Sequence, residues 1–106
     1  MVFFLDGPLA GKSFFLRGGQ ELTIGRSAPA DIIVNNNRVS RLHARISFSG
    51  DAFNVIDLGS TNGTYRIAGG KNDVNELRKM NEYSGDGIFQ LGAGAGDRIR
   101  FECTIE

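Results

Sequence analysis

Cysteine, tryptophan, histidine and proline are scarce in this sequence: one cysteine, no tryptophan, one histidine and two prolines occur among 106 residues. A single cysteine excludes a disulfide within the chain and is compatible with a reducing compartment, so we expect a cytoplasmic location. Cys103 lies in the apolar run 99–105 and is interpreted as a small buried hydrophobe. No cluster of His, Cys and Asp has the spacing of a metal site, and we expect neither a metal nor a cofactor.

Charge of either sign is not in excess, because twelve Lys and Arg residues balance twelve Asp and Glu residues. Bulk electrostatics therefore give no support to a nucleic-acid or membrane-surface role. No stretch approaches the ~20 apolar residues that span a membrane, and the N-terminus lacks the basic start and apolar core of a signal peptide. The length suits one compact domain over residues 1–106, whether alone or excised from a larger protein.

Glycine, in contrast, is abundant, with fifteen residues that indicate many tight turns. Short apolar and aromatic runs recur between these turns. Residues 43–49 alternate clearly, with Ala44, Ile46 and Phe48 on one face. Regular short strands with glycine turns indicate an all-β sandwich or barrel. We expect strands at residues 2–5, 13–16, 21–24, 32–34, 43–49, 52–58, 64–67, 88–91 and 98–105.

Residues 73–83 break this rhythm. Val74, Leu77 and Met80 recur three apart, a spacing that suits one or two helical turns lying on the sandwich. An ordered loop would explain the segment equally well. The pattern leaves a short helical insertion and a loop as open alternatives.

Two glycine-rich stretches look like nucleotide-binding motifs. Gly11-Lys12-Ser13 ends like a P-loop, which requires four residues between its glycines, but Asp6 stands where the first glycine should be. No helix can follow, because only three apolar residues separate Ser13 from Arg17. We interpret the stretch as the turn of a β-hairpin, and residues 92–96 (GAGAG), which also precede no helix, as another turn.

The arginines gather in the middle of the chain. Four arginines and one acid occur between residues 22 and 50, and Arg26, Arg38 and Arg41 fall in two predicted loops. Loops at one end of a sandwich converge in space, and guanidinium groups, hydroxyls and amides around one point make an anion site. Solvated surface arginine is the alternative for each one singly. The small polar residues near these loops are Ser27, Ser40, Ser60, Thr61 and Asn62.

Three blocks, in this order and at these separations, resemble the forkhead-associated (FHA) domain. They are residues 24–27 (IGRS), 39–44 (VSRLHA) and 57–65 (DLGSTNGTY), and the likeness extends to residues 6–12 and 96–99. The resemblance covers nearly the whole chain. It implies a β-sandwich of about eleven strands with its binding loops at one end. It also implies a non-catalytic module that binds phosphothreonine in partner proteins.

The resemblance also implies roles for individual residues. Arg26 would pair with the phosphate, and Ser40 would donate its hydroxyl to a phosphate oxygen. Arg41 would add a second cation. Arg38 lies where the family often tunes the choice of the residue three beyond the phosphothreonine. The peptide main chain would be held by two further residues, Thr61 and Asn62.

His43 is the other chemically prominent residue of these blocks. The resemblance implies an architectural role, in which His43 packs under the loops while Gly25 and Gly63 serve tight turns. A Ser40–His43 nucleophile–base pair is the competing interpretation. No third group evidently orients the histidine, and a hydrolase would also need an oxyanion site. We therefore expect no catalytic residue, no enzyme activity and no small-molecule substrate.

The sequence departs from the family pattern after Tyr65. Residues 68–70 stand where the family usually repeats an Asn-Gly turn, and the segment 71–87 is longer than the usual connection. This segment supports an alternative function, an assembly domain that docks proteins independently of phosphate. The expected partner is a phosphothreonine-containing protein or peptide in the first interpretation, with no nucleic acid and no membrane segment in either.

Overall fold

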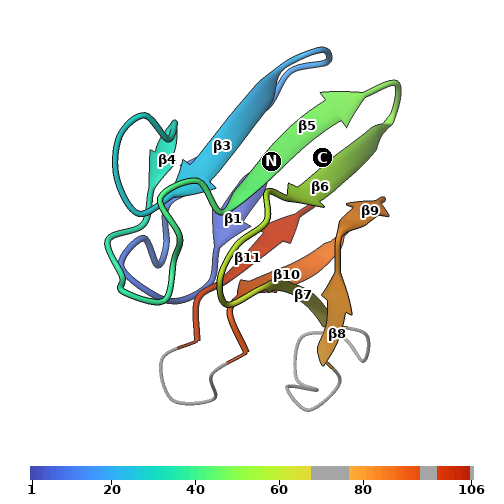
Figure 1. Cartoon of the computed structure of the whole chain (residues 1–106). Coiled ribbons are helices and arrows are strands. Elements are labelled where there is room, and N and C mark those ends of the chain that lie inside the picture. The colour runs from blue at the N-terminus through green and yellow to red at the C-terminus, as the bar shows by residue number, and fades with distance from the viewer. Residues whose placement is uncertain (68–76, 94–97, 106) are drawn as a thin grey trace.

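A computed structural model of the chain describes residues 1–67, 77–93 and 98–105, and the structural statements below concern these residues. They form eleven strands and no helix, so no helix in this part of the chain could cross a membrane. The strands lie in two sheets that face each other (Figure 1). The predicted all-β sandwich of about eleven strands is confirmed.

The first sheet contains six strands, in which every hydrogen-bonded pair is antiparallel. The second contains five, and its only parallel pair is β3 with β4. In spatial order the first sheet is β2 (Ser13–Phe14), β1 (Val2–Phe4), β11 (Arg100–Cys103), β10 (Gly87–Leu91), β7 (Thr64–Ile67) and β8 (Leu77–Met80). The second is β4 (Ile32–Ile33), β3 (Glu21–Gly25), β5 (Ala44–Ser49), β6 (Ala52–Asp57) and β9 (Glu82–Ser84).

The core fills the space between the sheets with aromatic and branched side chains. From the first sheet, Phe101 lies between Phe4 and Phe89, with ring centroids 5.5 Å apart in both pairs. From the second, Ile46 and Val55 are direct cross-strand partners and are fully buried. Alternation along each strand therefore buries one face of each sheet. This packed layer fixes the strand ends from which the loops start.

The helix considered for residues 73–83 is not found in the described part of that segment. Residues 77–80 form β8 in the first sheet, and residues 82–84 form β9 in the second. Leu77 and Met80, two of the three residues that recur three apart, are the first and last residues of β8 and are both half-buried, so their spacing belongs to one short strand and not to a helical face. Neither of the two open alternatives, a short helix or an ordered loop, describes residues 77–80 and 82–83, and residues 73–76 lie outside the described part.

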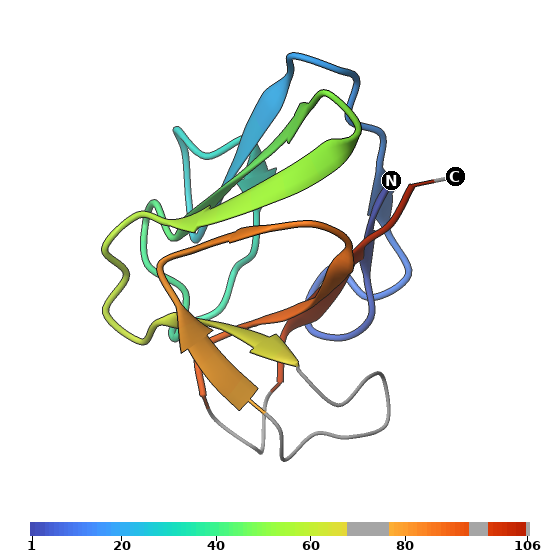
Figure 2. The same ribbon diagram turned by 90° about the vertical axis from the view of Figure 1, so that its right-hand side faces the viewer.

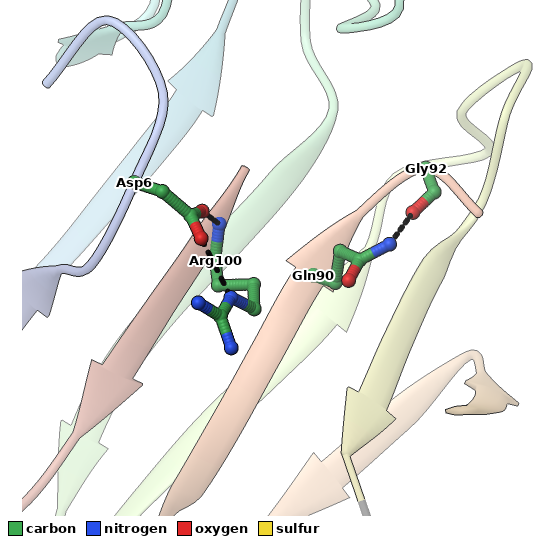
Figure 3. A network of polar contacts seen from close by, with 4 residues as sticks. All are labelled: Asp6, Gln90, Gly92 and Arg100. Carbon is green, nitrogen blue, oxygen red and sulfur yellow. Dashed lines mark hydrogen bonds and ion pairs between the residues drawn. The ribbon is translucent and has the colours of Figure 1, made fainter. Parts of the chain in front are cut away.

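The P-loop-like stretch is a β-hairpin, as predicted. β1 pairs antiparallel with β2, and β2 begins at Ser13, where a P-loop would open a helix. Asp6 has a structural task here: its carboxylate accepts hydrogen bonds from the Arg100 backbone N–H at 2.6 Å and from Arg100 Nε at 2.7 Å (Figure 3). The carboxylate therefore ties the connection between β1 and β2 to β11.

The two ends of the sandwich carry different parts of the chain. The loops between β3 and β4, β4 and β5, and β6 and β7 lie at one end. The two termini lie side by side at the other (Figure 2), where the Met1 ammonium donates a hydrogen bond to the Thr104 carbonyl at 2.9 Å. The end with the loops carries every predicted binding residue.

Candidate functional site

Three loops meet at Ser40. The Arg26 backbone N–H donates to the Ser40 carbonyl at 3.0 Å, and the Thr61 backbone N–H donates to Ser40 Oγ at 3.0 Å. One residue of the β4–β5 loop thus connects the β3–β4 loop with the β6–β7 loop. Because Oγ accepts the hydrogen of Thr61, the hydroxyl keeps its own hydrogen for another acceptor.

A polar depression of about 290 Å³ opens beside Ser40. Three arginines and no carboxylate line it, and none of these arginines forms an ion pair with a carboxylate of the described residues. Unneutralised guanidinium groups beside hydroxyl and amide donors suit a compact anion with several acceptor oxygens. The structure brings all six predicted phosphopeptide-contacting residues to this depression, whose lining consists of Arg26, Asn37, Arg38, Val39, Ser40, Arg41, Thr61 and Asn62.

Asn62 and Arg38 hold each other at the rim of the depression. Asn62 Nδ2 donates to the Arg38 carbonyl at 2.8 Å, and the Arg38 backbone N–H donates to Asn36 Oδ1 at 2.9 Å. The Arg38 guanidinium is less well satisfied, because its buried Nη1 has no hydrogen-bond partner in the described part of the chain. Through its bond to the Arg38 backbone, Asn36 helps to fix the conformation of the β4–β5 loop, although the sequence pattern assigned it no role.

His43 lies fully buried under the loops. Its Nδ1 accepts a hydrogen bond from the Ser40 backbone N–H at 3.1 Å, so Nε2 carries the ring hydrogen and donates it to the Gly63 carbonyl at 2.8 Å. Burial lowers the pKa of His43, and the opposing effects of the Gly63 carbonyl and the Asp57 charge are smaller. A neutral imidazole therefore connects the β4–β5 loop with the β6–β7 loop.

Asp57 organises the β6–β7 loop, a role that the sequence interpretation missed. Its carboxylate accepts hydrogen bonds from the Gly59 and Ser60 backbone N–H groups at 3.0 and 3.1 Å, from Ser60 Oγ at 2.5 Å and from Thr64 Oγ1 at 2.7 Å. Partial burial raises the pKa of Asp57, but these hydrogen bonds outweigh it and lower the pKa overall. An Asp followed by Gly and Ser at short spacing is the signal that could have revealed this turn.

Two glycines permit close approaches that a side chain would prevent. A Cβ atom on Gly25 would lie 1.8 Å from the Arg41 carbonyl oxygen and 2.9 Å from Ala30 Cβ. Gly63 has a φ of +83°, a conformation that residues with a Cβ rarely adopt. Its carbonyl accepts from Gly92 N–H at 2.9 Å as well as from His43. Both glycines therefore lie where one backbone segment closely approaches another beside the polar depression.

Comparisons with known proteins agree with this arrangement. The oxoglutarate dehydrogenase inhibitor of Corynebacterium jeikeium (strain K411) is 47% identical to this chain over 60 residues, which are 56% of this chain and 40% of that protein. The chain spans less than half the length of the curated relatives it matches.

Solved structures match over nearly the whole chain. The FHA domain of the CT664 protein from Chlamydia trachomatis superposes with a TM-score of 0.76 at 25% identity, covering 95% of this chain and 91% of that one. A structure from a structural and functional analysis of phosphothreonine-dependent FHA domain interactions superposes with a TM-score of 0.70 at 27% identity, covering 99% and 96%. The family model of the FHA domain matches residues 22–86. Since this match covers more than half of the sequence, the chain belongs to the FHA domain family.

Proposed function

We propose that this chain is a non-catalytic recognition module that binds phosphothreonine in partner proteins. The observation that carries the proposal is the Ser40 hydroxyl. It lines a depression that has three arginines and no carboxylate, and its hydrogen is free to be donated to a ligand there. The similarity to an FHA domain studied for its phosphothreonine-dependent interactions supports the same ligand.

In this proposal Arg26 and Ser40 bind the phosphate, and Arg41 adds a second cation. A phosphothreonine brings about −1.5 to −2 charges and three acceptor oxygens at pH 7. Each charge-assisted hydrogen bond contributes roughly 1.5–3 kcal/mol when it is sheltered. Two such contacts separate a phosphorylated peptide from the bare peptide by about a hundredfold or more.

Thr61 and Asn62 hold the peptide main chain, and Arg38 selects the side chain three residues beyond the phosphothreonine. Asn62 already donates one amide hydrogen to the Arg38 carbonyl, so its second hydrogen and its oxygen remain for the peptide. The Arg38 guanidinium has a buried nitrogen without a partner among the described residues. A partner supplied by the peptide would relieve that cost.

The same contacts argue against catalysis by Ser40 and His43. His43 Nδ1 accepts from the Ser40 backbone N–H and not from its hydroxyl, and Nε2 is bound to the Gly63 carbonyl. Both ring nitrogens are thus occupied by backbone, and neither is placed to take a proton from Ser40 Oγ. The proposal includes no cofactor. It also includes an intracellular location, which the buried free thiol of Cys103 supports.

Titration of a phosphothreonine peptide library against the wild type and Arg26→Ala tests the proposal. We expect wild-type binding in the micromolar range, a loss of at least about tenfold for Arg26→Ala, and a similar loss for Ser40→Ala. Arg17→Ala is the matched control, because it removes the same charge from an exposed position in the turn before β3. Binding that ignores both the phosphate and the Arg26 substitution would reject the proposal.

Phosphate-independent docking is the alternative, and the segment 71–87 was its main support. Residues 77–80 and 82–84 of that segment are β8 and β9, which pair within the two sheets. This part of the segment therefore completes the sandwich and does not form a separate docking element. Retention of a native partner by Arg26→Ala would favour the alternative.

A further inference from the structure

A lysine and a tyrosine meet beside Gly63, just outside the polar depression. Tyr65 on β7 and Lys79 on β8 are direct cross-strand partners, so their side chains share one face of the sheet. A Cβ atom on Gly63 would lie 3.3 Å from Lys79 Cε and 3.3 Å from Tyr65 Oη. The ammonium stem and the phenol hydroxyl therefore converge over a backbone position that has no side chain.

The backbone beneath this pair is firmly held. The Gly63 carbonyl accepts from Gly92 N–H at 2.9 Å, and Gln90 Nε2 donates to the Gly92 carbonyl at 2.8 Å, where β10 ends (Figure 3). Gln90 is also the cross-strand partner of Tyr65. Lys79 and Tyr65 thus lie on two adjacent strands, beside a loop end that is held by hydrogen bonds. Side chains in such a place are positioned more rigidly than side chains at a loop tip.

Neither head group is bound to another residue in the described part of the chain. Lys79 is exposed, and no carboxylate of the described residues forms an ion pair with it. The Tyr65 hydroxyl likewise has no hydrogen-bond partner among the residues whose placement is described. An ammonium and a phenol hydroxyl side by side offer hydrogen-bond donors with a positive charge, and a carboxylate is the side chain that accepts from both.

The phosphate contacts and the Lys79–Tyr65 pair lie beside the same short stretch of the β6–β7 loop. Thr61, Asn62 and Gly63 are consecutive, and Thr61 is the residue bonded to Ser40 Oγ. Two residues of chain span up to roughly 7 Å. A peptide that runs along this rim in an extended conformation covers that distance in two to three residues.

We propose that Lys79 and Tyr65 form a second contact for the same peptide, binding the carboxylate of an Asp or Glu two or three residues from the phosphothreonine. This inference rests on the proposed function of the phosphate site. It is separate from the selection assigned to Arg38, which belongs to the β4–β5 loop. Because Lys79 is exposed, the contribution is modest, about two- to fivefold in affinity.

Phosphothreonine peptides with a single Glu or Gln at each position from three before to three beyond the phosphothreonine provide the test. In the wild type we expect one position at which Glu binds about two- to fivefold tighter than Gln. Lys79→Gln should remove that gain and leave the affinity for the Gln peptides unchanged, and Tyr65→Phe should reduce it. The gain should also fade at high salt, because the contact is open to solvent.

Two further variants assign the effect. Lys12→Gln removes an exposed lysine next to β2, at the opposite edge of the same sheet, and should keep the gain. If the gain disappears in Arg38→Ala but survives in Lys79→Gln, or if no position prefers Glu, the Lys79 contact is rejected while phosphate binding stands. If the wild type does not distinguish phosphorylated from bare Gln peptides, the proposed function fails and this inference fails with it.

Discussion

The loop end of the sandwich presents a polar depression of about 290 Å³, whereas the end beside the termini has an apolar hollow of about 140 Å³. The loop end is shaped by side chains that bond to the backbone of another loop, such as His43 between Ser40 and Gly63. At the other end, backbone hydrogen bonds such as Gly19 N–H to the Phe48 carbonyl join the connection before β3 to β5. The apolar hollow is lined by Met1, Phe15, Leu16, Phe48, Phe53 and Ile105.

This difference indicates where single substitutions act on function. At the loop end, one polar side chain positions donors on two loops, so its loss should change binding and stability together. At the other end, a side chain contributes by the surface it buries. Substitutions there should change stability according to burial and leave phosphopeptide binding intact.

The largest combined effect on stability and phosphopeptide binding is expected for Gly25→Ala, which tests whether the loop end depends on close backbone contact. A Cβ on Gly25 would lie 1.8 Å from the Arg41 carbonyl oxygen, and a backbone atom cannot move aside as a flexible side chain can. We expect a loss of about 3 kcal/mol in the free energy of unfolding and a loss of phosphopeptide binding, because Arg41 belongs to the depression. Urea unfolding and a peptide titration would measure the two losses.

Gly18→Ala is the matched control for that substitution. No atom lies within 4 Å of a Cβ placed on Gly18, so its free energy of unfolding should stay within about 0.5 kcal/mol of the wild type. Equal losses for the two variants would show that the cost comes from adding any methyl group, and the role assigned to the Gly25–Arg41 contact would be wrong.

An intermediate effect on the free energy of unfolding is expected when the pH is lowered, because the single histidine, His43, then becomes protonated. Burial lowers the pKa of His43 below its ordinary value of 6.5, so the unfolded chain binds a proton at a higher pH than the folded chain. The contribution of neutral His43 to the free energy of unfolding is therefore complete above pH 6.5, and it decreases as the pH falls from 6.5 towards the pKa of the folded state. Unfolding without peptide measures this, which avoids the titration of the phosphate near pH 6.

His43→Gln separates this fall from that of Asp57. The pKa of Asp57 is lowered from its ordinary value of 3.8, so its contribution is lost only as the pH falls below 3.8. We expect His43→Gln to be less stable at neutral pH, to lack the slope just below pH 6.5 and to keep the fall below pH 3.8. An unchanged slope just below pH 6.5 in the variant would show that His43 does not cause it.

The sequence predicted strands best where a sheet has one buried and one exposed face. Ala44, Ile46 and Phe48 alternate because β5 lies inside its sheet, between β3 and β6. β8 gives no such signal, since Arg78 and Lys79 are both exposed at the edge of the sheet. The short helix considered for this segment is therefore wrong for residues 77–80, because the burial of an edge strand is too slight to give a period of two.

Much of the candidate site followed from the FHA-like blocks, and little of it from composition or spacing. The clustering of arginines and hydroxyls in neighbouring loops predicted an anion site, but only the resemblance assigned Arg26 and Ser40 to the phosphate. The carboxylate of Asp57 belongs to a matched block, but its four hydrogen bonds depend on the local turn. The meeting of Lys79 with Tyr65 depends on the register of β7 and β8, which a sequence without alternation does not define.

The smallest effect is expected for Phe15→Ala at the apolar end. Phe15 lines the hollow beside the termini but is 67% exposed, so its removal should change the free energy of unfolding by only about 0.5 kcal/mol and leave phosphopeptide affinity unchanged. Phe53→Ala is the control from the same hollow. Because Phe53 is 1% exposed, its loss should cost about 3–5 kcal/mol. A fall in phosphopeptide affinity for the folded Phe15→Ala protein would contradict the separation of the two ends, since it would connect the apolar hollow to the loops.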